Sequence, residues 1–307
     1  EHLFSCRPGG ADMVNHGQCS VSSGEAYSMG NLGGKLYIAS YTHARLSIYD
    51  PTKPYRFGTA RGSNPRDIGR LDDVAYRPRA MVAGPAGKVW VGSIPDYGMW
   101  GGTLAWYDPA TEKHRSHRHL LKDCSVVSLA WLPARGRLVA GLSIEGGTGT
   151  LPCARSAGFV FWDPVRDKAA GAETFGIDDI SAIIDIHPAG PRHIYASVIR
   201  GKPETPAHKL AAELVLIDLD ARRVCDRSPY AGDYGWPVEV AMRQGPDGAI
   251  YGATLLQFFR IIPGTAQREV LFKTPLANRA DYITVAGPII GRTFHFASRH
   301  RLRAIDI

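Results

Sequence analysis

The stretch that decides the fold reads Lys88-Val-Trp-Val-Gly-Ser93, followed by Thr103-Leu-Ala-Trp-Tyr-Asp-Pro109. Both runs are rich in β-branched and aromatic residues, and Gly, Pro and Asp residues separate them. Such runs predict short strands joined by turns. The same pair occurs earlier as Lys35-Leu-Tyr-Ile-Ala-Ser40 and Arg45-Leu-Ser-Ile-Tyr-Asp-Pro51, so the pattern is a repeat.

The repeat has a period of about 50 residues and continues along the chain. Further copies of the strand pair lie at 137–143 with 158–164, 193–198 with 213–219, 249–254 with 258–263, and 293–298 with 301–306. A preceding strand is predicted at 79–85, 126–131, 180–185, 238–242 and 282–288. A repeat of this length built of strands predicts an all-β fold, a single β-propeller of six four-stranded antiparallel blades, with seven blades as the alternative. Residues 27–307 are predicted to form the propeller domain, and residues 1–26 are an N-terminal segment that closes the ring or belongs to a seventh blade.

The composition is that of a folded protein, with 44% apolar and 21% charged residues. The sequence contains no run of about 18 apolar residues, so it predicts no membrane span. The chain begins at Glu1 without a leader, which favours a processed product that is secreted or periplasmic. The cysteines Cys6, Cys19, Cys124, Cys153 and Cys225 form no CxxC pair. They could pair as Cys6–Cys19 and Cys124–Cys153 in an oxidising compartment, or stay reduced as small buried side chains.

The formal charge of +7 and the pI near 9.2 predict an anionic partner. The sequence contains no motif of a recognition helix, a zinc finger or an RNP-like strand, so it does not favour nucleic acid as that partner. An acidic oligo- or polysaccharide is the partner that we predict. No GxSxG, HExxH or GxGxxG motif is present in a suitable context, which argues against the common hydrolase, zincin and dinucleotide-binding classes.

Candidate site residues lie in the loops that a propeller gathers on one face around its channel. Arginine can bind a carboxylate, His and Tyr can move protons, and Trp and Tyr can stack on a sugar. The structural alternatives are an ordinary loop position for His43 and packing between blades for Tyr97 and Trp100. The predicted substrate-binding residues are Arg45, Trp100, Arg200, Trp236 and His300.

The strand pairs that end in Asp-Pro, together with the loop Pro95-Asp-Tyr-Gly98, resemble the propeller domains of polysaccharide lyases, including the L-rhamnose-α-1,4-D-glucuronate lyase type. The resemblance covers most of the chain at the level of the blades. It implies a carbohydrate-active enzyme that cleaves a uronate-linked glycan by β-elimination. It also implies that His43 is the base, that Tyr97 is an acid, and that Arg79 and Arg299 hold the uronate carboxylate.

Two other functions remain open from the residues alone. One is a propeller that binds a ligand or a protein without catalysis, because a fold does not define a function. The other is a metal-dependent lactone hydrolase with a divalent cation such as calcium in the central channel. Asp96, Glu145 and Asp179 could supply the oxygen ligands that calcium prefers.

Overall fold

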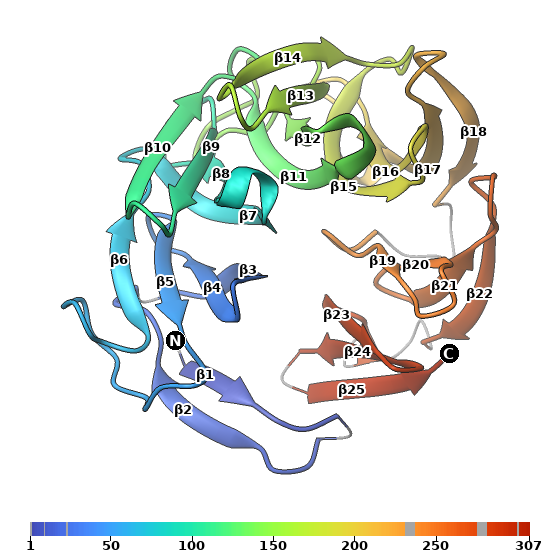
Figure 1. Ribbon diagram of the computed structural model, residues 1–307. Helices are drawn as coiled ribbons and strands as arrows, with labels where there is room; N and C mark the ends of the chain where they lie inside the picture. Colours follow the sequence, from blue (N-terminus) through green and yellow to red (C-terminus); the bar gives the residue numbers. More distant parts are fainter. Residues whose placement is uncertain (1, 9, 23, 231–236, 275–280, 300) are drawn as a thin grey trace. The chain divides into compact units, whose positions relative to one another are not determined.

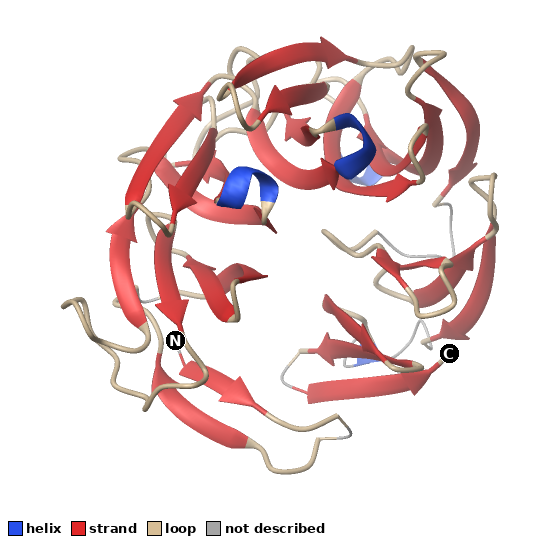
Figure 2. Ribbon diagram, viewed as in Figure 1, coloured by secondary structure: helices blue, strands red, loops and turns tan. Residues whose placement is uncertain are grey.

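The structure is a computed structural model, and it describes residues 2–8, 10–22, 24–230, 237–274, 281–299 and 301–307. Its regular elements are almost all β-strands, and its helices within these residues are short 3₁₀ turns at Pro85–Gly87, Pro133–Arg135 and Ala207–Lys209 (Figure 2). No helix of the described residues is long and apolar enough to cross a membrane.

The chain divides into two compact units, residues 1–173 and 174–307. The sequence instead divides the chain into a segment of residues 1–26 and one propeller domain of residues 27–307. That division stays a prediction.

The N-terminal unit contains a hairpin and three sets of four antiparallel strands (Figure 1). The hairpin pairs β1 (His2–Ser5) with β2 (Val14–Gln18). The first set is β3 (Ala26–Leu32), β4 (Lys35–Ser40), β5 (Arg45–Tyr49) and β6 (Arg66–Arg70). The second is β7 (Ala75–Ala83), β8 (Val89–Pro95), β9 (Thr103–Asp108) and β10 (Lys113–Arg118). The third is β11 (Ser125–Leu132), β12 (Arg137–Ser143), β13 (Phe159–Asp163) and β14 (Lys168–Glu173).

The C-terminal unit contains two sets of four antiparallel strands and one sheet of three. The first set is β15 (Ile180–Ala189), β16 (His193–Arg200), β17 (Ala211–Asp218) and β18 (Arg223–Pro229). The second is β19 (Arg243–Gln244), β20 (Ile250–Ala253), β21 (Gln257–Ile261) and β22 (Arg268–Lys273). The three-stranded sheet is β23 (Val285–Ile290), β24 (Thr293–Ser298) and β25 (Arg301–Asp306).

These sets confirm the predicted all-β, propeller-like fold of small antiparallel sheets. The predicted count of six or seven four-stranded blades is wrong. The sheet β23–β25 has three strands, and the hairpin β1–β2 forms a sheet of its own. The residues before β3 pack on the first set of strands, since Leu3 of β1 and Cys19 after β2 are buried together with Ile38 of β4.

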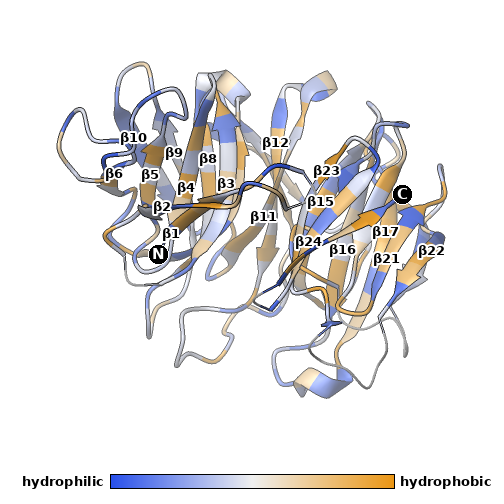
Figure 3. Cartoon of the chain, turned by 90° about the horizontal axis from the view of Figure 1, so that it is seen from below, coloured by the Kyte–Doolittle hydropathy of each residue, from blue (hydrophilic) through white to orange (hydrophobic). Residues whose placement is uncertain are grey.

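Each unit has its own hydrophobic core. In the N-terminal unit, Tyr37, Leu46 and Val91 belong to one buried cluster, and the indole of the fully buried Trp90 donates to the Pro85 carbonyl. In the C-terminal unit, the rings of Phe258 and Phe294 stack with centroids 4.1 Å apart. Figure 3 shows apolar residues recurring along strands such as β16 and β17. Side chains on alternate positions of a strand share one face, which is how such short strands fill a core.

The aspartates that end the third strand of several sets explain the repeated Asp in the sequence. Asp108 accepts a hydrogen bond from the Ala110 amide, and Asp163 accepts bonds from the amides of Val165 and Arg166. Asp218 accepts bonds from the amides of residues 220 and 221. An Asp side chain that binds the backbone two residues later fixes a tight turn. The motif therefore sets the turn that leads into the fourth strand.

Candidate functional site

Three tyrosines meet where strands of two successive sets of the N-terminal unit begin and end. Tyr41 follows β4, Tyr76 lies at the start of β7, and Tyr97 follows β8. The backbone fixes these positions, because the Ala44 amide donates to the Tyr76 carbonyl over 3.0 Å. The Asp96 amide likewise donates to the carbonyl of residue 74 over 2.8 Å. We call Tyr41, His43, Tyr76, Arg77 and Tyr97 the tyrosine cluster.

The aromatic rings of the tyrosine cluster pack edge to face. Tyr76 is at the centre, with ring centroids 5.1 Å from Tyr41, 5.2 Å from Tyr97 and 5.0 Å from His43. These distances lie in the range favoured by T-shaped aromatic pairs. The phenol oxygens of Tyr41 and Tyr97 are 3.2 Å apart and share a hydrogen bond. The packing thus holds two phenols side by side.

Arg77 supplies the positive charge of the cluster. Its guanidinium carbon lies 5.2, 5.8 and 5.5 Å from the ring centroids of Tyr41, Tyr76 and Tyr97. A cation within about 6 Å of a ring face is attracted to the aromatic ring. The sequence places Arg77, with Arg79, in a loop of the candidate face, but it predicts no role for Arg77. A signal for such a role is the run Tyr76-Arg77-Pro78, which places a tyrosine and an arginine at the start of one strand.

The two neighbouring phenols have pKa values that move apart. The hydrogen bond from Tyr41 lowers the pKa of Tyr97, and the charge of Arg77 lowers it further. The same hydrogen bond, with partial burial, raises the pKa of Tyr41 to about 12. A pair of titratable groups shifted in opposite directions is the arrangement that assigns one group to accept a proton and the other to hold one.

His43 belongs to the cluster but faces Tyr76 rather than Tyr97. Its backbone has a φ of 65° and lies in the left-handed region. Its Nδ1 atom is buried and has no hydrogen-bond partner among the described residues. Burial lowers the pKa of His43, and the nearby charge of Arg70 lowers it further. The imidazole is therefore neutral at pH 7 and packs as an aromatic neighbour of Tyr76.

A second loop braces the loop that carries Tyr97 and Trp100. The Gly98 amide donates to the Thr148 carbonyl over 3.1 Å, and the Gly147 amide donates to the Met99 carbonyl over 2.8 Å. The Trp100 indole donates to the carbonyl of residue 151 over 2.9 Å. A side chain at Gly147 would place its Cβ 1.8 Å from the Asp96 carbonyl oxygen, so only glycine fits. Tyr97 and Trp100 stay 49% and 38% exposed, which leaves their rings available to a ligand.

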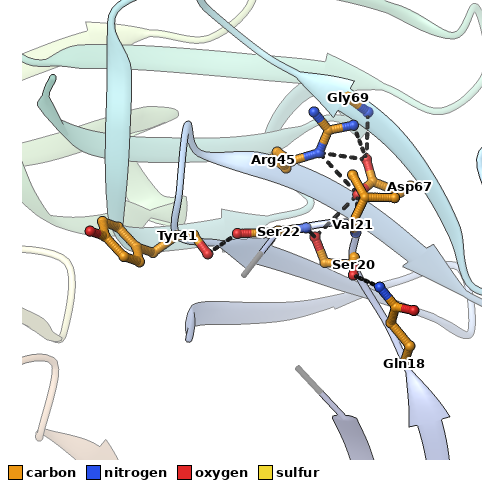
Figure 4. Close-up of polar contacts among 8 residues, drawn as sticks. All are labelled: Gln18, Ser20, Val21, Ser22, Tyr41, Arg45, Asp67 and Gly69. Atoms are coloured by element: carbon orange, nitrogen blue, oxygen red, sulfur yellow. Dashed lines mark hydrogen bonds and ion pairs between the residues drawn. The ribbon is translucent and has the colours of Figure 1, made fainter. Parts of the chain in front are cut away.

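Arg45 is held by a buried carboxylate. Its guanidinium makes a bidentate contact with Asp67, with nitrogen to oxygen distances of 3.0 to 3.2 Å (Figure 4). Asp67 is 2% exposed and also accepts hydrogen bonds from the Ser20 hydroxyl and the amides of Val21 and Gly69. Figure 4 shows the ring of Tyr41 apart from this network, although the Ser22 hydroxyl donates to the Tyr41 carbonyl. Asp67 thus ties the segment after β2 to the first set of strands, and Arg45 balances its charge.

Arg79 lies two residues beyond Arg77 on β7 and contacts a different ring. Its guanidinium carbon is 5.1 Å from the ring centroid of Tyr27. Tyr27 in turn lies 6.0 Å from the ring centroid of Tyr41. Of the two arginines on this strand, Arg77 is the one placed over the ring of Tyr97.

The remaining predicted residues belong to the C-terminal unit. Arg200 donates to the Asp178 carbonyl and lies 3.5 Å from the Glu213 carboxylate. Arg299 is exposed and has its backbone in the left-handed region, with a φ of 54°. Trp236 and His300 lie outside the described residues.

The predicted calcium ligands Asp96 and Glu145 lie in the N-terminal unit, and Asp179 lies in the C-terminal unit. Asp96 accepts a hydrogen bond from the Tyr97 amide, and the backbone carbonyl of Glu145 accepts one from the Ser125 hydroxyl. Among the residues that the structure describes, a different trio has ligand atoms within reach of one ion, namely His193, Asp218 and Cys225. The described cysteines are all free, so neither Cys6–Cys19 nor Cys124–Cys153 is a disulfide here.

Comparison with known proteins identifies a structural neighbour. The fold is similar to that of the PQQ-bound form of an aldose sugar dehydrogenase from Streptomyces coelicolor, with a TM-score of 0.52. The two sequences are 15% identical, and the match covers 89% of this chain and 90% of the neighbour. At that identity the likeness shows a shared fold. No family model and no curated protein matches the sequence.

Proposed function

We propose that the protein binds an acidic carbohydrate at the tyrosine cluster and cleaves it by β-elimination next to a uronate. The observation that carries this proposal is the shared hydrogen bond between the phenols of Tyr41 and Tyr97, with the Arg77 guanidinium over both rings. A carbohydrate ligand also agrees with the neighbour's description as an aldose sugar dehydrogenase. An extracellular or periplasmic location, which the sequence predicts, would give the protein access to such glycans.

The reaction requires a cation, a proton acceptor and a proton donor. The C5 proton of a uronate is weakly acidic until the negative charge of its carboxylate is neutralised. The base takes this proton, and the electron pair of the C5–H bond becomes the C4=C5 double bond. The bond from C4 to the glycosidic oxygen breaks, and that oxygen takes a proton as it leaves. Proton transfer by positioned side chains contributes about a hundredfold to ten-thousandfold in rate.

The residues of the cluster can fill these three roles. Tyr97 is assigned as the base, because the hydrogen bond from Tyr41 and the charge of Arg77 lower its pKa and favour the phenolate. Tyr41 is assigned as the proton donor, because its pKa is raised to about 12 and it stays protonated at neutral pH. Arg77 is assigned to the carboxylate, since guanidinium groups bind carboxylates with paired hydrogen bonds.

The other candidates take supporting roles in this scheme. His43 packs edge to face against Tyr76 and is a positioning residue. The exposed ring of Trp100 is assigned to stack on a neighbouring sugar, as aromatic rings do in carbohydrate sites. Arg79, Arg200, Arg299 and the cation site for calcium stay predictions.

The cofactor named for the structural neighbour is not part of the proposal. PQQ is a flat ring that carries several carboxylates, so its site calls for several cations. The tyrosine cluster contributes one guanidinium, that of Arg77, while the nearby Arg45 is bound to Asp67. The cluster therefore does not fit PQQ, and we derive no step through it.

The test is the ultraviolet absorbance of the unsaturated uronate, measured over a panel of glucuronate, galacturonate and mannuronate polysaccharides. Tyr97→Phe should lower turnover on the best substrate by at least about a hundredfold. Tyr49→Phe, which removes a phenol oxygen outside the cluster, is the matched control and should keep full turnover. Near-normal turnover by Tyr97→Phe would refute the assigned role.

Binding without catalysis is the second candidate, and the exposure of Tyr97 and Trp100 favours it. Side chains that stack on a sugar bind it whether or not a proton is moved. Affinity electrophoresis in gels that contain each polysaccharide distinguishes the two functions. Retarded migration without any gain of absorbance would support binding and exclude the lyase.

A further inference from the structure

A second group of reactive side chains lies in the C-terminal unit, apart from the tyrosine cluster. His193 is the first residue of β16, Asp218 is the last residue of β17, and Cys225 lies in β18. One imidazole nitrogen, one carboxylate oxygen and the thiol sulfur all lie within 4.8 Å of one another. The group thus brings three different ligand atoms to one end of three adjacent strands.

The strand register explains why the three residues meet. His193 and Asp218 are direct partners across β16 and β17. Directly opposite residues of an antiparallel pair have neighbouring side chains on one face. Leu216 of β17 pairs with Asp226, and the next residue, Ile217, pairs with Val224. Cys225 lies between these two partners on β18 and is therefore the extra residue of a bulge. Bulges redirect side chains, and this one directs the thiol towards Asp218.

The chemistry of the three ligand atoms indicates the class of ion. Calcium and magnesium prefer oxygen ligands alone, whereas thiolate and imidazole ligands are typical of zinc sites. Zinc is also bound by carboxylate oxygen, and three protein ligands leave a fourth tetrahedral position for water. His193 is 35% exposed and Cys225 is exposed, so an ion can reach the group from solvent.

Asp218 has existing partners that an ion must share or displace. Its Oδ1 atom accepts the amides of Asp220 and Ala221 in the turn after β17, and these bonds can persist. Its Oδ2 atom lies 2.6 Å from the Arg192 guanidinium and 3.9 Å from His193 Nε2. Arg192 also lies 3.8 Å from the Asp220 carboxylate, which offers the guanidinium a second partner. An ion therefore competes with Arg192 for one oxygen.

We propose that His193, Asp218 and Cys225 bind a divalent ion of the zinc class, which fastens β18 at its bulge to β16 and β17. The bulge interrupts the hydrogen bonding between β17 and β18, and the ion adds a cross-link at that point. This site is independent of the function proposed for the tyrosine cluster.

Cobalt(II) is the probe for this site, because its bond to a thiolate gives a charge-transfer absorption band. Titration of the reduced full-length protein should produce this band at one cobalt per chain, and added zinc should remove it. Cys225→Ser should abolish the band, whereas Cys153→Ser, which changes another exposed cysteine, should preserve it. His193→Gln should weaken cobalt binding at least about tenfold. The matched control His208→Gln, at an exposed histidine of the same unit, should have no effect.

Two further measurements test the proposed ion site: the cobalt affinity of an Arg192 variant and the unfolding temperature with zinc. Arg192→Gln removes the competing guanidinium and should tighten cobalt binding, so weaker binding would overturn the role given to Asp218. Zinc should raise the unfolding temperature of the unaltered protein and leave that of Cys225→Ser unchanged. The proposal is overturned if the band is absent while thiol titration shows that Cys225 is reduced and reactive. It is equally overturned if Cys225→Ser binds cobalt as tightly as the unaltered protein.

Discussion

Replacement of the Asp67 carboxylate should destabilise the N-terminal unit more than any exposed charge change. Asp67 is 2% exposed, binds Arg45 in a bidentate ion pair, and accepts hydrogen bonds from one hydroxyl and two amides. In Asp67→Ala all these donors lose their acceptor, and Arg45, whose side chain is 22% exposed, keeps a largely buried charge. Removing one partner of a buried ion pair costs about 3–5 kcal/mol, and we expect Asp67→Ala to fall in that range.

Urea unfolding followed by tryptophan fluorescence measures this loss. Five of the six tryptophans lie in residues 1–173, so the signal reports mainly the N-terminal unit. Asp12→Ala is the matched control, because Asp12 and its partner Arg7 are 65% and 79% exposed and such a pair contributes about 1 kcal/mol or less. A loss of less than about 1 kcal/mol in Asp67→Ala would show that the network does not hold the segment after β2 as described.

Three other outcomes follow from the structure. Gly147→Ala must displace the loop of Tyr97, because the new Cβ would lie 1.8 Å from the Asp96 carbonyl oxygen, and it should weaken glycan binding measured by affinity electrophoresis. Burial raises the pKa of Asp185 from 3.8 to about 6. Between these pH values the Asp185 carboxyl is mostly protonated in the folded state and mostly ionised in the unfolded state. The contribution of Asp185 to stability should therefore fall by about 3 kcal/mol as the pH rises from about 4 to about 6, and the difference between the unaltered protein and Asp185→Asn in thermal unfolding should change with pH accordingly. Trp90→Ala, at a fully buried side chain, should cost about 3–5 kcal/mol in urea unfolding, and a loss below about 1 kcal/mol would contradict its place in the core.

The strand pairs were predictable because their signal is local. The runs 35–40, 45–50, 88–93 and 103–108 carry strand-forming residues bounded by turn residues, and β4, β5, β8 and β9 occupy them almost residue for residue. The strand predicted at 238–242 is wrong. Val240 has a φ of 47° in a turn, and β19 begins at Arg243 instead. Apolar residues at that place are buried without forming a strand, which periodicity alone cannot distinguish.

The candidate site was harder to predict because its members meet through tertiary contacts. The sequence identified Tyr97, Trp100 and His43 as loop residues, but nothing local indicates that Tyr76 would pack between Tyr97 and His43. The two arginines of β7 look alike in the sequence, yet Arg77 lies over Tyr97 and Arg79 over Tyr27. Arg45 resembles a ligand-binding residue until its buried partner Asp67, 22 residues later, is known.

The bracing of the Tyr97 loop has a consequence for how the ligand specificity of this protein could be altered. The bonds from the amides of Gly98 and Gly147 join main-chain atoms, so they do not depend on the side chains of the bracing loop. Leu151 binds the Trp100 indole through its backbone carbonyl, and its side chain is 83% exposed, so this residue can vary in charge and size while the phenol of Tyr97 keeps its place. A library randomised at position 151, with Gly147, Thr148 and Thr150 retained, would alter which glycan is recognised without displacing the groups that would act on it.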